Sequence, residues 1–330
     1  MMKKRRFGKL GTVSSLSLGG GGLGQLWGST TREEAIATTQ MAVASGINLL
    51  DMAPVYGDGE AENVIGKAFD GKLPDDVRVT TKCNLVDVPV DRIHEVLEKS
   101  LIDSLARMKI SSVDIFFLHN WIIDETTESA IRGTNRIVFE EYVVPAFKKI
   151  TSKGLAKTWG ITGIGDPKVL IDILGSDNKP DCIQIITNLL DSPGGLGFPN
   201  VDPQPREIIK TAVESEVPIM GIRAVQAGAL TNQIDRYLPP EHPESLDFKR
   251  AKAFRSLARN LAISPSILAH QYALSMVGPS TITLGVKNRD ELAECLLAEQ
   301  NGILDESVTG QIHAACLLYT SDAADEGLGV

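Results

Sequence analysis

The chain has 330 residues, of which 43% are hydrophobic and 23% charged, and its formal net charge is −9. A chain of this length buries a sizeable core in one large domain or two smaller ones. The acidic balance argues against a nucleic-acid partner, and no segment approaches the ~20 apolar residues of a membrane helix. The basic run at residues 3–6 precedes no continuous apolar stretch of the signal-peptide kind. We therefore expect a cytoplasmic protein without a membrane or nucleic-acid partner.

The cysteines carry little information about function. The four of them are scattered without C-x-x-C spacing, at Cys83, Cys182, Cys295 and Cys316. This pattern predicts neither a zinc site nor a disulfide framework, so we expect no metal, and a reducing compartment fits it best.

The last fifteen residues, 316–330, differ in character from the rest of the chain. Their string from Cys316 to Glu326 resembles a reading frame through a sequencing adapter more than evolved protein. We therefore predict a native domain over residues 1–315 and a disordered, non-native tail over 316–330.

Strand-like and helix-like segments alternate along the chain after an opening hairpin-like stretch. Strands are expected at residues 14–19, 47–52, 77–82, 113–118, 156–161, 182–188, 217–222 and 280–285. Helices are expected at residues 31–45, 60–70, 91–107, 139–153, from 167, 206–215, near 246–260, 265–275 and 289–299. Regular alternation is typical of a parallel sheet, and eight strand–helix units predict a single-domain α/β fold, the (β/α)8 TIM barrel.

Three of the expected strands end in side chains suited to proton chemistry. Asp51, Lys82 and His119 close or directly follow apolar runs, and Tyr56 comes five positions after Asp51. In a parallel barrel the carboxyl ends of the strands form the catalytic face, so these four side chains are expected to converge on one pocket.

The four side chains together predict a proton donor facing a carbonyl group. An unperturbed phenol has a pKa of about 10, and a nearby ammonium lowers it. Lys82 is expected to act in this way on Tyr56, with Asp51 holding the ammonium by a charge-assisted hydrogen bond. His119 is expected to orient the substrate oxygen. Reduction of a carbonyl also needs a hydride source.

Residues 51–66 resemble the signature of the aldo-keto reductases, D-x-A-x-x-Y-G-x-G-x-S-E-x-x-x-G, with Ala61 in place of the serine. Lys82 and His119 fall where that family has its other two catalytic residues, and the resemblance runs from Arg6 to about Ala298. It implies a (β/α)8 barrel that reduces an aldehyde or ketone with NADPH, with Tyr56 as the proton donor and a small-molecule carbonyl compound as the substrate.

The resemblance also implies cofactor-binding positions, several of which depart from the family pattern. Gly163 stands where an asparagine is usual, and the strand end near Gly221 has no aromatic residue to stack on nicotinamide. Lys287 replaces an arginine that meets the 2′-phosphate, so NADPH is expected and NADH is the alternative. The implied cofactor-binding set is Thr162, Gln184, Asn188, Arg223, Gly285, Lys287 and Glu294.

Some interpretations stay open at this point. Trp27 and Trp121 follow the first and fourth strands and either line a substrate pocket or cover the barrel mouth. Arg223 lies near the cofactor or faces a carboxylated substrate. A non-catalytic, nucleotide-sensing regulatory barrel is the alternative function, and a Schiff-base role for Lys82 is a third. The sequence predicts no oligomeric state.

Overall fold

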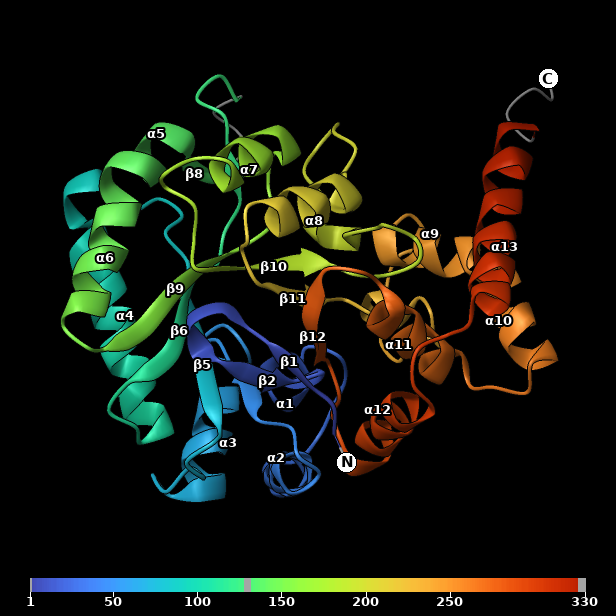
Figure 1. Cartoon of the computed structure of the whole chain (residues 1–330), viewed down its shortest axis with the longest axis horizontal. Helices are drawn as coiled ribbons and strands as arrows, with labels where there is room; N and C mark the ends of the chain where they lie inside the picture. Colours follow the sequence, from blue (N-terminus) through green and yellow to red (C-terminus); the bar gives the residue numbers. More distant parts are fainter. Residues whose placement is uncertain (1, 128–131, 326–330) are drawn as a thin grey trace.

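Eight parallel strands close into a barrel, which confirms the predicted fold (Figure 1). The computed structural model describes residues 2–127 and 132–325, with side chains up to Ala315. The strands neighbour one another in chain order around the barrel. They are β3 (Leu16–Gly19), β4 (Leu49–Asp51), β5 (Arg78–Cys83), β6 (Val113–Leu118), β9 (Ala156–Thr162), β10 (Cys182–Ile186), β11 (Ile219–Ile222) and β12 (Pro279–Leu284).

Helices surround the barrel and bury their apolar faces against the outer surface of the strands. Thr31 caps α2, because its hydroxyl accepts a hydrogen bond from the backbone N–H of Glu34. The helices that follow the strands are α2 (Arg32–Ala44), α3 (Glu60–Phe69), α4 (Ile93–Met108), α6 (Val144–Ser152), α7 (Pro167–Leu174), α8 (Pro205–Glu214), α11 (Pro265–Ser275) and α12 (Arg289–Asn301).

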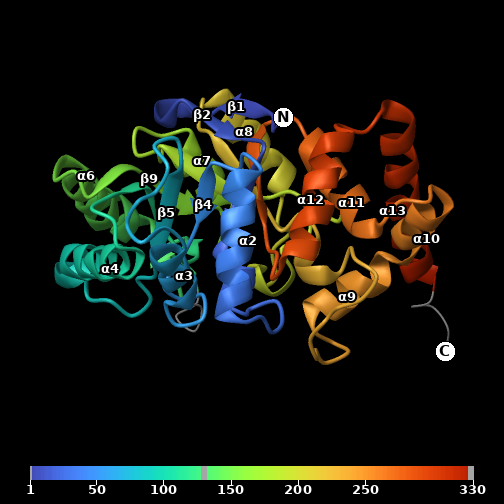
Figure 2. The ribbon, with the colours of Figure 1, turned by 90° about the horizontal axis from the view of Figure 1, so that it is seen from below.

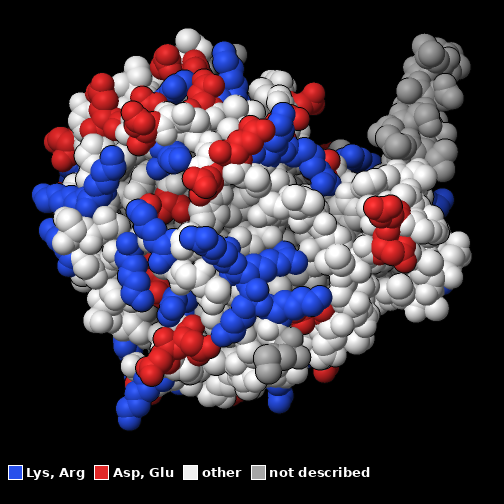
Figure 3. Space-filling view, in the orientation of Figure 1, with Lys and Arg blue, Asp and Glu red and all other residues white. Residues whose placement is uncertain are grey.

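A hairpin of β1 (Lys4–Arg6) and β2 (Thr12–Ser14) closes the amino-terminal end of the barrel. Phe7, between the two strands, is 2% exposed and packs with Phe117 and Met220 in the barrel interior. Figure 2 shows the hairpin at one end of the molecule and helix α9 (Pro243–Arg250) at the other. The basic run of residues 3–6 lies in this hairpin, on a face where Lys and Arg gather (Figure 3).

The loops hold elements that the sequence did not predict. The glycine run forms a short helix, α1 (Gly20–Leu23), and the loop after β6 contains the paired strands β7 (Ile122–Ile123) and β8 (Thr134–Asn135). The helix expected at residues 139–153 starts earlier and has three parts. One turn, α5 (Arg136–Val138), leads into a π-helical turn at Phe139–Val143, and α6 continues from Val144. The helix expected near 246–260 is two helices, α9 and α10 (Lys252–Asn260), which meet at Ala251.

A last helix, α13 (Glu306–Asp325), packs beside α10, and Ile312 is fully buried there. The sequence predicts disorder from residue 316 onwards, whereas the backbone of residues 316–325 continues this helix; the Ala and Leu residues of the segment favour helix. Residues 326–330 of the expected tail lie outside the described residues. Within the part of the chain that the structure describes, no helix is long and apolar enough to cross a bilayer.

Candidate functional site

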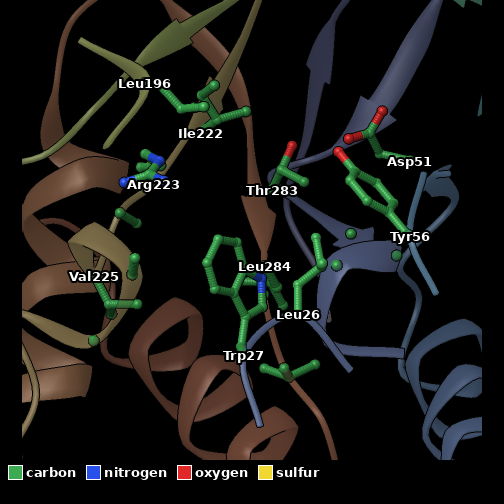
Figure 4. A pocket seen from close by; sticks show the side chains of 18 of the residues that line it. Leu26, Trp27, Asp51, Tyr56, Leu196, Ile222, Arg223, Val225, Thr283 and Leu284 are labelled. Atoms are coloured by element: carbon green, nitrogen blue, oxygen red, sulfur yellow. The ribbon is translucent and has the colours of Figure 1, made fainter. Parts of the chain in front are cut away.

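A cavity of about 820 Å³ opens at the carboxyl ends of the barrel strands. Asp51, Tyr56 and His119 line it, and Lys82 lies fully buried beside them. Figure 4 shows the Tyr56 hydroxyl next to the Asp51 carboxylate on one side of the cavity, with Trp27 projecting between this group and Arg223. The structure thus brings together the four residues that the strand ends predicted.

Lys82 and Asp51 form an ion pair beneath Tyr56. The Lys82 Nζ atom is 2.9 Å from Asp51 Oδ1, and it donates a 2.8 Å hydrogen bond to the carbonyl of Met52. The same Nζ atom lies 4.9 Å from the centroid of the Tyr56 ring. Burial acts to lower the pKa of Lys82, but the charge of Asp51 and the contact with Tyr56 outweigh it and raise this pKa. The lysine is therefore a fixed positive charge at this site.

Tyr56 differs from the expectation in the direction of its pKa. Removal of the phenol from water raises its pKa, and the Asp51 charge adds to this, while the Lys82 ammonium opposes it without reversing it. The Lys82 ammonium alone predicts a lowered pKa for Tyr56, and burial of the phenol is not visible in a motif. Tyr56 is consequently a protonated phenol at neutral pH, which is the form that a proton donor requires.

His119 faces the edge of the Tyr56 ring and directly follows β6. The two ring centroids are 5.9 Å apart in a T-shaped arrangement, and the backbone N–H of His119 donates a 2.8 Å hydrogen bond to the carbonyl of Cys83. Burial, with a smaller contribution from the Lys82 charge, lowers the pKa of His119 to about 3. The imidazole is therefore neutral at physiological pH, and it directs a hydrogen bond without adding a charge.

Most of the expected cofactor positions line the cavity. Gln184 donates a 2.9 Å hydrogen bond from Nε2 to Asp51 Oδ1, and Thr162 donates one of 3.0 Å to the carbonyl of Leu118. The lining also includes Arg223, Gly285, Lys287 and Glu294.

Asn188 is the exception among the expected cofactor positions. Its side chain is fully buried and is not part of the cavity wall. The amide donates to the carbonyls of Ser192 and Arg223, and its oxygen accepts from the backbone N–H of Leu190. These bonds shape the loop after β10, so the structure places Asn188 in a loop-forming position.

Arg223 and Arg236 lie on the ring of Trp27. Their guanidinium carbons are 5.8 and 5.2 Å from its centroid, which is within the range of cation–π contact. Arg223 has a φ of 60°, and its guanidinium donates a 3.1 Å hydrogen bond to Glu244. Burial lowers the pKa of Arg223, although Glu244 opposes this. The left-handed backbone turns the arginine from the strand end into the cavity wall.

Lys287 lies where β12 leads into α12, and two carboxylates already hold its ammonium. Its Nζ atom is 2.5 Å from Asp235 Oδ2 and also contacts Glu291. Burial acts to lower the pKa of Lys287, and the hydrogen bonds to the two acids raise it overall. An incoming phosphate therefore competes with these carboxylates for the ammonium.

Both predicted tryptophans line the cavity, and Trp121 also joins two loops. Its indole N–H donates a 3.1 Å hydrogen bond to the carbonyl of Leu196, and its ring meets Phe198 edge-on at 5.6 Å. The indole of Trp27 lies so close to two glycines that a Cβ atom at Gly21 or Gly285 would come within 2.7 or 3.0 Å of it. Both tryptophans are thus part of the cavity wall, and the contacts of Trp121 with Leu196 and Phe198 also make it part of the loops at the barrel mouth.

Several residues at this site were not predicted from the sequence. Thr80 donates a 2.6 Å hydrogen bond to Asp51 Oδ1, and the i, i+2 spacing from Lys82 on one strand was the available signal. Arg236, Asp235 and His270 line the cavity from loops or helices. They follow no strand end, so no comparable signal marks them.

The cavity fits a nicotinamide dinucleotide in size and chemistry. Its volume lies at the upper end of the range for cofactor and ligand sites. Three cations, Arg223, Arg236 and Lys287, line it, and they supply the positive charge that phosphate groups need. Gln184 offers an amide beside the tetrad formed by Asp51, Tyr56, Lys82 and His119, as a carboxamide partner requires.

Comparisons with known proteins agree with this geometry. The model of the Aldo/keto reductase family matches residues 15–316. L-galactose dehydrogenase of Arabidopsis thaliana is 27% identical over 290 residues, which cover 87% of this chain and 84% of that protein. An uncharacterized oxidoreductase of Bacillus subtilis is 24% identical over 310 residues, 90% of this chain and 91% of its own.

Solved structures of similar fold include reductases with bound cofactor. The holo form of an aldo-keto reductase from Bacillus halodurans has a TM-score of 0.70 at 21% identity, covering 96% of both chains. An aldo-keto reductase from Klebsiella pneumoniae in complex with NADPH has a TM-score of 0.68 at 18% identity, covering 94% of both. The chain thus belongs to the aldo/keto reductase family and is an NAD(P)H-dependent oxidoreductase that acts on small carbonyl compounds.

Proposed function

We propose that the protein reduces an aldehyde or ketone to an alcohol with NADPH, and that Tyr56 donates the proton. A bound nicotinamide cofactor supplies the hydride. The single observation that carries the proposal is the position of a protonated Tyr56 at the cavity wall, with the buried Lys82 ammonium 4.9 Å from its ring.

Each member of the tetrad has a distinct role in this proposal. The neutral imidazole of His119 donates a hydrogen bond to the carbonyl oxygen and fixes its direction. Tyr56 transfers its proton to that oxygen as negative charge develops there. The Lys82 ammonium stabilises the phenolate that remains, and Asp51 holds the ammonium in place. The pKa of about 3 means that the His119 ring is neutral at physiological pH. The N–H proton of a neutral imidazole is less acidic than the Tyr56 phenol, so Tyr56 is the acid.

The cofactor side of the proposal rests on the residues that line the cavity. Gln184 binds the carboxamide, Arg223 and Arg236 meet the diphosphate, and Lys287 meets the 2′-phosphate of NADPH. Because Asp235 and Glu291 already neutralise Lys287, we expect only a modest preference for NADPH over NADH. Gly285, Thr162 and Glu294 complete the proposed cofactor contacts, and Trp27 and Trp121 the proposed substrate walls.

The Schiff-base alternative for Lys82 finds no support in this geometry. The lysine is 0% exposed, and its ammonium is paired with Asp51 and Met52, so a substrate carbonyl has no access to the amine. The relatives are dehydrogenases and reductases, which gives no support to a regulatory subunit.

Tyr56→Phe tests the proposal directly. We expect kcat for an aldehyde panel to fall by roughly 10²–10⁴-fold, the usual contribution of general acid catalysis. The dissociation constant for NADPH should change little, since the substitution removes one hydroxyl and no charge. Tyr237, which is 90% exposed, gives the matched control as Tyr237→Phe. Wild-type turnover in the Tyr56 variant would refute the assignment.

A further inference from the structure

One oxygen of Asp51 receives three polar contacts in the interior of the barrel. Besides the Lys82 ammonium at 2.9 Å, Oδ1 accepts hydrogen bonds from the Thr80 hydroxyl at 2.6 Å and from the Gln184 amide at 2.9 Å. All four residues are at most 3% exposed. Buried carboxylates need such partners, and here two neutral donors supplement the ion pair.

The register of the barrel explains why Thr80 reaches this oxygen. Asp51 on β4 is the direct cross-strand partner of Thr80 on β5, so both side chains point to the same face of the sheet. Lys82 lies two residues further along the same strand and therefore shares that inward face. Thr81 between them points the other way, and its hydroxyl binds the Glu62 carboxylate at 2.5 Å.

The hydrogen bond from Thr80 bears on where the lysine charge lies. The ammonium of Lys82 has a second acceptor, the carbonyl of Met52 at 2.8 Å, so its position is a balance between two partners. A carboxylate held by Thr80 cannot rotate freely, and part of its charge is taken up by the hydroxyl. The ammonium is then left available to act on the Tyr56 ring above it.

We propose that Thr80 is a positioning residue of the proton relay, whose hydroxyl orients Asp51 so that Lys82 stays beneath Tyr56. Thr80 is not part of the cavity wall, so its hydroxyl does not face a ligand bound in the cavity. Gln184 is a second donor to the same oxygen, but it lines the cavity and so also affects the cofactor. The inference rests on the proposed function, because it assigns Thr80 a part in the proton transfer from Tyr56.

The test compares Thr80→Val, Thr80→Ser and Thr81→Val by their pH profiles of kcat with NADPH and an aldehyde. Without the Thr80 hydroxyl, Asp51 attracts Lys82 more strongly and raises the pKa of Tyr56. Thr80→Val should therefore lower kcat by about tenfold and move the alkaline limb to higher pH. The dissociation constant for NADPH should stay at its wild-type value.

The other two variants separate positioning from structure. Thr80→Ser keeps the hydroxyl and should restore the wild-type profile. Thr81→Val removes an equally buried hydroxyl from a carboxylate on the outer face, so it should lower thermal stability and leave the profile in place. If Thr80→Val does not fold, Thr80→Ala replaces it.

Several results would overturn the inference. They are a wild-type profile in Thr80→Val or its alanine replacement, the same profile change in Thr81→Val, or a serine variant as impaired as the valine one. Failure of the proposed function looks different, because the wild-type protein would then reduce no carbonyl compound at any pH.

Discussion

The Nζ atom of Lys82 lies 2.9 Å from Oδ1 of Asp51, and the two side chains are 0% and 4% exposed. Because neither charge reaches water, each is stabilised mainly by the other. Two neutral donors, Thr80 and Gln184, add to this at Asp51, and the carbonyl of Met52 accepts from Lys82. A pair of this kind differs from the surface ion pairs of the same molecule, such as Lys99 and Asp103, whose side chains are 71% and 47% exposed.

Removing one member of the buried pair should destabilise the protein strongly. Asp51→Asn leaves the Lys82 ammonium without its counter-charge, at a cost of about 3–5 kcal/mol in the free energy of unfolding. The double variant Asp51→Asn/Lys82→Met should recover part of this loss, as urea denaturation would show. Lys99→Met at the exposed pair should change stability by less than about 1 kcal/mol. Strictly additive effects of the two buried substitutions would contradict this coupling.

His119 should make the folded state sensitive to acid. Its pKa is about 3 in the fold and about 6.5 in the unfolded chain, so between these values only the unfolded state binds the proton. Stability from this residue is therefore complete above about pH 6.5 and is lost as the pH falls toward 3. His119→Asn should lose less stability than the wild type between pH 7.5 and 5. Equal losses would show that His119 does not contribute.

Lys287 should discriminate between the two nicotinamide dinucleotides. Lys287→Met removes the charge proposed to meet the 2′-phosphate, so the dissociation constant for NADPH should rise by roughly tenfold, the value of a charged hydrogen bond. The constant for NADH should change little. Asp235→Asn should act in the opposite direction, because it frees the ammonium from one of its two carboxylates. Fluorescence titration with both dinucleotides measures these constants, and equal changes for both would exclude the assignment.

Trp27 should report cofactor binding by its fluorescence. Its ring lies against Gly21 and Gly285 and between two arginines, in the part of the cavity assigned to the cofactor. NADPH should quench the wild-type emission, and Trp27→Phe should remove much of this response. Trp159 stacks on Phe147 outside the cavity wall, so Trp159→Phe should keep the response and serves as the control. Quenching unchanged in Trp27→Phe would place the cofactor elsewhere.

The sequence predicted the barrel well because buried parallel strands read as apolar runs with polar ends. Asp51, Lys82 and His119 converge since their strands are neighbours and end at the same edge. The helices that begin with a capping residue or a proline, such as α2 and α11, were predicted within about one residue of their bounds for the same local reasons.

What the sequence did not predict depends on contacts between distant segments. Asn188 was expected at the cofactor, but its amide is taken by the loop after β10 and the residue that follows β11. The pKa of Tyr56 was expected to fall, and it rises because the fold buries the phenol. The helix α1 consists mostly of glycine, which has low helix propensity, and its close packing against Tyr56 and against residues 285–286, which follow β12, overrides that tendency.

The hairpin that places Phe7 inside the amino-terminal end of the barrel closes that end to ligands. Phe7, Phe117 and Met220 fill the far end, so whatever enters the cavity must leave by the way it came. A carbonyl compound bound near the opening of the cavity blocks the exit of a ligand bound more deeply. When two molecules share this entrance, we therefore expect the more deeply bound one to enter first and to leave last.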